Sequence, residues 1–272
     1  MLRHNLIIAA AVLALSACST TGINRLQTEK MSVSPSLRVM TFNIQSGRKG
    51  IDKVAALIRE ANPDVVALQE VDRFTARAGG KDQLAALSEL TGMAYSAFFK
   101  TTSFYGGDYG IAILSKYPLS DAEQRGLPTE LSEPRAVGRA LVHGPNGELN
   151  VYVTHLSNLP TRSLLRVQQT HTILNWMASD SHARVLMGDF NDGEGSGPVK
   201  AVGAVMPEAF AVAGHGPSAT FPFPIIPDAR LDYVFASAEL HATDAHVIRK
   251  VASDHYPMVV EFAQGALTAT AK

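Results

Sequence analysis

The sequence lacks two features that would each indicate a particular class of protein. It has one cysteine in 272 residues, which excludes a disulfide within the chain. Its 24 Lys and Arg residues are balanced by 25 Asp and Glu residues, so it does not resemble a basic protein that coats nucleic acid, although a local basic groove stays open. What it has is 46% hydrophobic and 18% charged residues, enough for one large domain with a full core.

The first residues form a targeting segment. A basic start is followed by the apolar run Leu6 to Leu15, which is too short to cross a bilayer comfortably. Leu15-Ser16-Ala17-Cys18 resembles a bacterial lipobox, which implies cleavage of residues 1–17 and acylation of Cys18. The alternative is an ordinary secretory signal with an incidental cysteine. We expect residues 18–36 to be a flexible tether that anchors the protein in the cell envelope, facing the periplasm. Ser19 follows the cysteine where an inner-membrane retention signal usually has Asp, which favours sorting to the outer membrane.

Short apolar runs alternate with segments of helical periodicity along the rest of the chain. Strands are expected at Leu37–Asn43, Asp64–Leu68, Tyr95–Phe99, Gly110–Leu114, Ala136–Val142, Leu149–Thr154, Arg184–Met187, Leu231–Phe235, Val247–Val251 and Met258–Phe262. Helices are expected at Ile51–Ile58, at Leu84–Leu90 and at Leu164–Met177, the last with an apolar stripe that begins at Leu164. The pattern predicts a layered α/β domain over residues 37–262, followed by a tail over 263–272.

Polar side chains recur where these apolar strands end. In Gly188-Asp189-Phe190-Asn191 a carboxylate and an amide follow a buried run, although that tetrapeptide alone would also suit a turn. The polar residues that lie at or just beyond the end of an apolar strand are Asn43, Glu70, His155, Asp189, Asn191, Asp254 and His255. Such a set could hold one hard divalent ion and activate water. Because no thiolate or His-x-x-x-His spacing is present, Mg²⁺ or Mn²⁺ is favoured over zinc.

Seven motifs in order resemble the endonuclease/exonuclease/phosphatase superfamily, over Leu37 to Phe262. They are Thr41-Phe42-Asn43-Ile44, Leu68-Gln69-Glu70, Tyr109-Gly110-Ile111-Ala112-Ile113-Leu114-Ser115, Thr154-His155-Leu156, Gly188-Asp189-Phe190-Asn191, Leu231-Asp232-Tyr233 and Ser253-Asp254-His255. The resemblance implies a four-layer sandwich, in which two mostly antiparallel β-sheets pack face to face with helices on the outside.

The same resemblance implies which residues bind metal and phosphate. Glu70 would be the principal ligand of Mg²⁺, with Mn²⁺ as a substitute; Asn43 would lie beside it, and Asp254 would complete the site directly or through water. Arg135 would contact the substrate phosphate. Arg139 shares its strand face and is a weaker candidate, for which a surface salt bridge is the alternative.

The remaining residues carried over from the resemblance would perform the chemistry. Asp189 would orient and deprotonate the attacking water, and Asn191 would hold that water or the phosphate. His155 and His255 would contact the scissile phosphate, while Asp232 would orient His255. Which histidine acts as the general acid, and whether one or two metal ions take part, stays open.

We therefore predict a monomeric, Mg²⁺-dependent phosphoesterase that hydrolyses a phosphodiester, or else a phosphomonoester, by in-line attack of activated water. A periplasmic or secreted nuclease is the alternative, and a phospholipid would fit the membrane tether. The run Phe221-Pro222-Phe223-Pro224-Ile225-Ile226-Pro227 is the nearest candidate for contact with lipid. A non-catalytic binding lipoprotein is a further alternative, but such a protein would be free to lose Glu70, Asp189 or His255, and all three are present.

Overall fold

The computed structural model describes residues 36–130, 132–223 and 228–263, all within one unit that begins at Val33. The predicted signal segment and Cys18 lie outside the described residues, as do the tether apart from Ser36 and the C-terminal tail apart from Ala263, which ends β11. The elements are β1 (Leu37–Asn43), α1 (Ile51–Ala61), β2 (Val65–Arg73), α2 (Gln83–Thr91), β3 (Tyr95–Phe104), β4 (Gly107–Ser115), β5 (Leu119–Leu127), β6 (Arg135–Gly144), β7 (Gly147–His155), α3 (Ser163–Met177), β8 (Ala183–Asp189), α4 (Gly197–Gly203), α5 (Ala209–Ala213), β9 (Asp232–Ala236), β10 (His241–Val247) and β11 (Met258–Ala263), with short 3₁₀ turns at Gln45–Gly47 and Ala76–Ala78. No helix among the described residues is long and apolar enough to cross a membrane.

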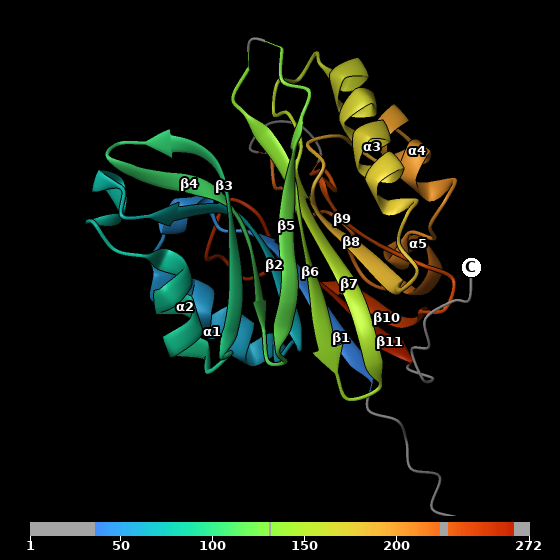
Figure 1. Cartoon of the computed structure of the whole chain (residues 1–272), viewed down its shortest axis with the longest axis horizontal. Coiled ribbons are helices and arrows are strands. Elements are labelled where there is room, and N and C mark those ends of the chain that lie inside the picture. The colour runs from blue at the N-terminus through green and yellow to red at the C-terminus, as the bar shows by residue number, and fades with distance from the viewer. Residues whose placement is uncertain (1–35, 131, 224–227, 264–272) are drawn as a thin grey trace, which may run out of the picture. The chain divides into compact units, whose positions relative to one another are not determined.

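The strands form two sheets that stand face to face (Figure 1). One has the order β10-β11-β1-β2-β4-β3 and the other the order β5-β6-β7-β8-β9. Among the described strands, only the pairs β1–β2 and β7–β8 run parallel. The parallel register sets His155 of β7 beside Asp189 of β8, and the antiparallel pairing of β8 with β9 sets Asp189 beside Asp232. Three polar residues thus meet at one edge of the second sheet.

Three apolar clusters define four layers. The central cluster joins the inner faces of the sheets and includes Val39 and Val65 from one sheet and Val151 and Val185 from the other. A second cluster joins the six-stranded sheet to α1 and α2, and a third joins the five-stranded sheet to α3 and α4 (Figure 1). Apolar side chains that alternate between two buried sheet faces give this layering. The predicted four-layer sandwich is therefore confirmed.

Local boundaries differ from the sequence prediction in several places. Leu164 is 82% exposed, because α3 packs through a face that includes Leu165, Ile173 and Trp176. The predicted strand Val247–Val251 is wrong beyond its first residue, since β10 ends at Val247. Strand β5 was not predicted; most of its residues are polar and exposed at the sheet edge, so it lacks an apolar pattern.

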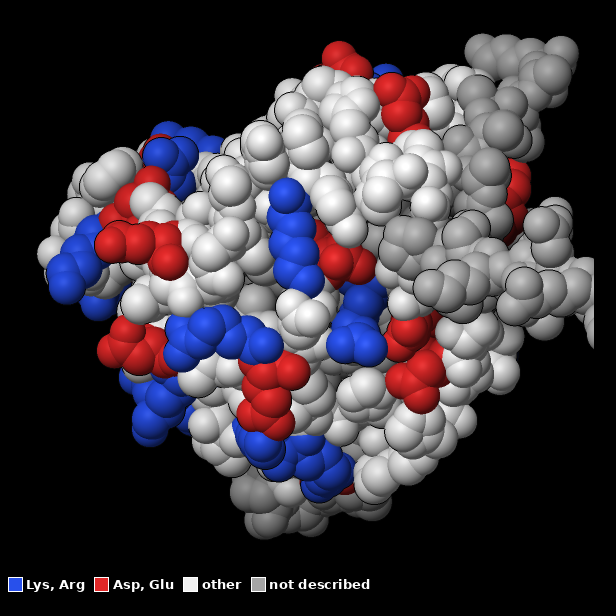
Figure 2. Space-filling view, turned by 90° about the horizontal axis from the view of Figure 1, so that it is seen from below, with Lys and Arg blue, Asp and Glu red and all other residues white. Residues whose placement is uncertain are grey.

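One face of the molecule shows the balance of charge that the composition indicates (Figure 2). On the face seen from below, Lys and Arg side chains lie among Asp and Glu side chains and form no continuous patch of one sign (Figure 2).

Candidate active site

Four strands deliver the central polar residues of the site. Asn43 ends β1, His155 ends β7, Asp189 ends β8 and Asp232 begins β9. The close approach of β7 and β8 depends on Gly188, because a Cβ atom there would lie 2.0 Å from the backbone oxygen of Thr154. Backbone pairing, rather than side-chain contact, therefore sets the distance between His155 and Asp189.

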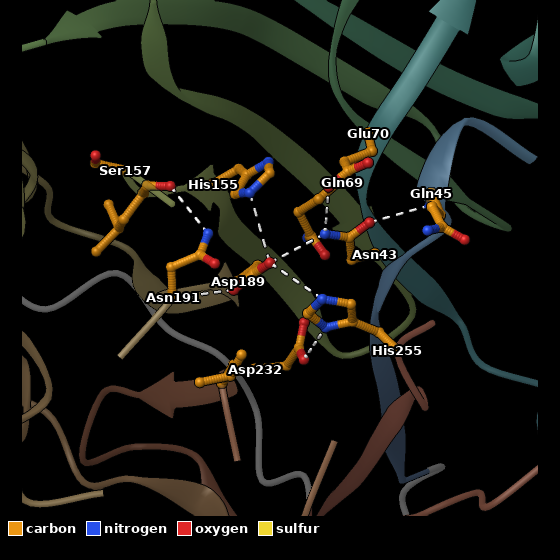
Figure 3. A network of polar contacts seen from close by, with 12 residues as sticks. Asn43, Gln45, Gln69, Glu70, His155, Ser157, Asp189, Asn191, Asp232 and His255 are labelled. Atoms are coloured by element: carbon orange, nitrogen blue, oxygen red, sulfur yellow. Dashed lines mark hydrogen bonds and ion pairs between the residues drawn. The ribbon is translucent and has the colours of Figure 1, made fainter. Parts of the chain in front are cut away.

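Asp189 is the centre of the polar network (Figure 3). Its Oδ2 accepts a hydrogen bond of 3.0 Å from Nδ2 of Asn43, on the opposite sheet. The same oxygen lies 3.5 Å from Nε2 of His155 and 3.6 Å from Nε2 of His255, while Oδ1 accepts from the backbone N–H of Asn191 at 2.8 Å. Asp189 is 1% exposed, and burial raises its pKa to about 7, although His255 opposes this rise. One buried carboxylate is thus surrounded by donors from four segments of the chain.

His255 is held by a second carboxylate. Its Nδ1 lies 2.8 Å from Oδ2 of Asp232, which fixes the ring and directs Nε2 toward Asp189. Burial alone would lower the pKa of His255, but the charges of Asp232 and Asp189 outweigh it and raise the pKa to about 10. The predicted pairing of Asp232 with His255 is present in the structure, and the two carboxylates favour the charged form of the imidazole.

His155 has a different environment. Nη1 of Arg135 lies 3.0 Å from Nδ1 of the ring, and the same atom is 3.0 Å from Oε1 of Glu133. Because a guanidinium only donates hydrogen bonds, Nδ1 must accept, and the ring proton is on Nε2, toward Asp189. Burial and the nearby charges of Arg135 and His255 keep the pKa of His155 well below its usual value. The site therefore holds one neutral and one charged imidazole.

Glu70 and Asp254 supply oxygen atoms beside this network. Glu70 lies at a β-bulge of β2, between Leu68 and Val71, and its Oε1 accepts from Nδ2 of Asn43 at 3.0 Å. The strand was expected to end there, but it resumes after the bulge and runs to Arg73. Burial raises the pKa of Glu70, and the charge of Asp254 raises it further. Two hard carboxylate donors that repel one another suit a divalent cation, so the residues present fit the metal that the sequence predicts.

Two of these residues have a strained backbone. Glu70 has a φ of 57° and Asn191 a φ of 49°, in the left-handed region that side chains other than glycine rarely adopt. Glu70 thereby places its carboxylate beside Asn43, whereas Asn191 donates from Nδ2 to the backbone oxygen of Leu156 at 3.1 Å and contacts Asp189 through its backbone N–H. Such outliers often mark functional positions.

Arg139 is the one predicted site residue that the structure does not place beside the polar residues around Asp189. Its guanidinium contacts Asp180 at 3.0 Å and Glu123 at 3.3 Å. It shares a strand face with Arg135, as predicted, but four residues of extended chain separate them by about 13 Å. The salt bridge, which was the alternative interpretation, is what the structure shows.

Sequence reasoning missed the contacts of Gln45, while Thr220-Phe221-Pro222, which resembles a loop that often lines the substrate cleft in the superfamily, makes two further contacts in the site. Gln45 donates from Nε2 to Oδ2 of Asp254 at 2.7 Å, and its backbone N–H binds Oδ1 of Asn43 at 3.1 Å. Thr220 Oγ1 accepts from the backbone N–H of Asp232 at 3.1 Å, and the ring of Phe221 packs against His255 with 4.8 Å between ring centroids. Gln45 directly follows a recognised motif, which was the only signal available for it.

Asp189, Asp232 and His255 form a second group of possible metal ligands, since one donor atom of each lies within 4.8 Å of the others. The charged imidazole already balances the carboxylates there. Glu70 and Asp254 therefore remain the more suitable place for a cation in this site, while His215, Asp244 and His246 form a separate and more exposed group of possible ligands.

Comparisons with known proteins agree with this geometry. A family model described as "Endonuclease/Exonuclease/phosphatase family" matches residues 40–255. The chain is 27% identical over 249 residues to the uncharacterized protein YbhP of Escherichia coli, covering 83% of this chain and 96% of that protein. Among solved structures, an endonuclease/exonuclease/phosphatase from Beutenbergia cavernae has a TM-score of 0.73 and 28% identity, over 85% of this chain and 72% of the other. A mannosyl-6-phosphatase from Bacteroides thetaiotaomicron has a TM-score of 0.67 and 16% identity, over 84% and 99% of the two chains.

The two-sheet sandwich, with carboxylates and imidazoles at strand ends that could bind a metal ion, agrees with a family of divalent-metal-dependent phosphoesterases. The chain belongs to the endonuclease/exonuclease/phosphatase family, whose members are phosphoesterases and nucleases.

Proposed function

We propose that this protein hydrolyses a phosphodiester bond with the help of a bound divalent metal ion. One observation carries the proposal: Oδ2 of Asp189 lies within 3.6 Å of Nε2 of both His155 and His255, next to Asn43 and Glu70. This places a proton acceptor beside two imidazole donors in a water-poor setting. Attack of water on a phosphate ester needs those two kinds of group together.

Glu70 and Asp254 would hold the metal, Mg²⁺ or Mn²⁺, with Asn43 beside them. Both carboxylates offer oxygen ligands, and Gln45 and Asn43 hold them in place. When bound, the metal supplies Lewis-acid polarisation of the phosphoryl oxygen.

The other residues of the site would bind and orient the substrate and move its protons. Asp189 would accept the proton of the attacking water, which Asn191 helps to position. His155, with its proton on Nε2, and the charged His255 would donate to the phosphate oxygens, and Arg135 would fix the neutral form of His155. Charge that develops on the phosphate would thus meet donors that are already oriented.

The leaving group is the less defined part of the substrate. A phosphomonoester stays a second candidate, and the structural neighbour from Bacteroides thetaiotaomicron is named as a mannosyl-6-phosphatase. A nuclease is the alternative within the same chemistry, and the near-neutral composition argues mildly against it.

A substrate panel tests this proposal. A soluble form that starts near Ser32, incubated with Mg²⁺, should hydrolyse at least one of bis-p-nitrophenyl phosphate, p-nitrophenyl phosphate, DNA, RNA, sphingomyelin and phosphatidylinositol phosphates. Preference for the bis ester over the monoester would support a diesterase. A folded protein that hydrolyses none of them, with Mg²⁺ or Mn²⁺, would favour a non-catalytic binding protein on this fold.

We further propose that Cys18 anchors the protein as a lipoprotein in the cell envelope, with the catalytic domain facing the periplasm and outer-membrane sorting favoured. The lipobox-like Leu15-Ser16-Ala17-Cys18 supports this, together with the polar stretch that separates it from the first strand. A tether of this kind would hold the enzyme near membrane-bound or periplasmic phosphate esters.

A further inference from the structure

A cleft of about 500 Å³ lies beside the active site and carries charge of one sign. Its walls come from the segment after β1, the start of α1, the turn at Ala76–Ala78 and the start of α2. Three cationic side chains, Arg48, Arg77 and Lys81, line it, and no carboxylate does so among the described residues. This contrasts with the chain as a whole, in which the two signs balance.

Two of the three cations have no internal partner. Within residues 36–130, 132–223 and 228–263, the side chains of Arg48 and Lys81 make no ion pair or hydrogen bond, whereas Arg77 forms two hydrogen bonds with Asp72, of 2.6 and 2.8 Å. Unpaired cations that converge on one cleft lower the free energy of an anion there. The cleft is thus electrostatically prepared for a ligand that the protein itself does not supply.

The walls of the cleft are fixed by buried hydrogen bonds. Gln83, 7% exposed, donates from Nε2 to the backbone oxygen of Ser46 at 2.7 Å and accepts at Oε1 from the N–H of Asp72 at 2.9 Å. Gly47 leaves room for this amide, because a Cβ atom there would lie 2.9 Å from it. Three separate segments are therefore joined into one rigid wall.

Arg77 connects this cleft to the catalytic group. It also lines a second cavity of about 290 Å³, whose other walls include Glu70, Tyr109 and Arg135. Its guanidinium lies 5.2 Å from the ring of Tyr109, so it stands between the two cavities in a fixed position. Arg77 is thus a wall residue shared by the cavity that contains Glu70 and the cleft that contains Arg48 and Lys81.

We propose that this cleft binds a second phosphate group of the substrate, separate from the one that is hydrolysed. The inference rests on the proposed function, and it narrows the substrate to phosphate esters with at least two phosphates. The unpaired guanidinium of Arg48 and the unpaired ammonium of Lys81 favour phosphate over a neutral sugar or choline group.

The test compares substrates with one phosphate and with several. The probes are bis-p-nitrophenyl phosphate, 5′-phosphorylated tetrathymidylate and glycerophosphoinositol bisphosphate. The first has one phosphate, and the other two show whether the second phosphate belongs to a nucleotide or to a lipid headgroup. Arg48→Glu/Lys81→Glu should lower kcat/KM for at least one multiply phosphorylated probe about tenfold more than for the bis ester. Lys200→Glu, an exposed charge reversal on α4, is the matched control and should leave that ratio unchanged.

Binding without turnover keeps the test independent of the proposed function. Fluorescein-labelled tetrathymidylate and the inositol probe, titrated in excess chelator, should bind the unmodified chain more weakly as salt rises, and the double variant should abolish this dependence for the preferred probe. Equal effects of the double variant on all substrates, or unchanged binding of both multiply phosphorylated probes, would overturn the inference. If the protein hydrolyses none of the substrates but still binds a multiply phosphorylated probe in a charge-dependent way, the result would count against the proposed function and not against the second phosphate site.

Discussion

At the scale of single residues, the pair of Asp232 and His255 divides positioning from chemistry. The carboxylate of Asp232 contacts Nδ1 of His255, and Nε2 of the same ring faces Asp189. His255→Ala should lower kcat/KM by about 10²–10⁴, the usual effect of removing a proton-transfer group. Because the two residues act as one unit, adding Asp232→Asn should cost little more.

The measurement is kcat/KM for the wild type, both single variants and the double variant, with folding checked by thermal melting. Losses that multiply would show that the two residues act independently. A His255→Ala variant with nearly full activity would remove the imidazole from the mechanism.

The charge on His255 gives a second prediction at this scale. Burial lowers its pKa, but Asp232 and Asp189 raise it to about 10, so the ring should stay protonated through neutral pH in metal-free protein. Asp232→Asn removes one of the two negative charges, and the pKa should therefore fall. Nitrogen-detected NMR titration of the imidazole in chelator follows this directly. An unchanged pKa in the variant would mean that Asp232 does not stabilise the charged ring.

At the scale of elements, the approach of β7 and β8 depends on Gly188. A Cβ atom there would lie 2.0 Å from the oxygen of Thr154, so Gly188→Ala must push the strands apart. We expect a loss of about 1–3 kcal/mol, seen as a fall in Tm of several degrees. Gly126→Ala, in β5, meets no atom within 4 Å and is the matched control. Equal Tm values for the two variants would contradict this account of the pairing.

The strand ends of the site were predictable because their apolar runs stop at polar residues. Asn43, His155 and Asp189 each end a strand as the sequence indicates. Glu70 was placed correctly, but its bulge was not, since nothing in the composition of β2 marks a left-handed residue. The family motifs supplied the pairing of Asp232 with His255, which periodicity alone does not contain.

Other features depend on tertiary contacts that a single sequence does not encode locally. Arg135 contacts His155, whereas Arg139 forms an ion pair with Asp180. These contacts depend on which side chains surround each guanidinium in the folded protein. Strand β5 forms through backbone pairing with β6, so its polar residues gave no signal. Leu164 is apolar but exposed, because α3 packs with a neighbouring face.

At the scale of the whole molecule, the proposed anchor determines where the enzyme acts. Replacing Cys18 with Ala should block lipidation, because no thiol remains to be acylated, and the protein should leave the membrane fraction. Metabolic labelling with a fatty-acid analogue and cell fractionation measure both effects. Ser19→Ala is the neighbouring control and should keep the lipid. Normal processing and membrane attachment of the Cys18 variant would contradict the lipoprotein proposal.

The metal dependence of hydrolysis tests the central proposal most directly. The rate of bis-p-nitrophenyl phosphate hydrolysis should be measured in excess chelator and then across a Mg²⁺ titration, for the wild type, Glu70→Gln and the control Glu123→Gln. Hydrolysis should vanish in chelator and return with Mg²⁺ or Mn²⁺, and Glu70→Gln should need far more metal, because it loses the charged ligand. Full activity in chelator, or an unchanged Mg²⁺ requirement in Glu70→Gln, would contradict the account.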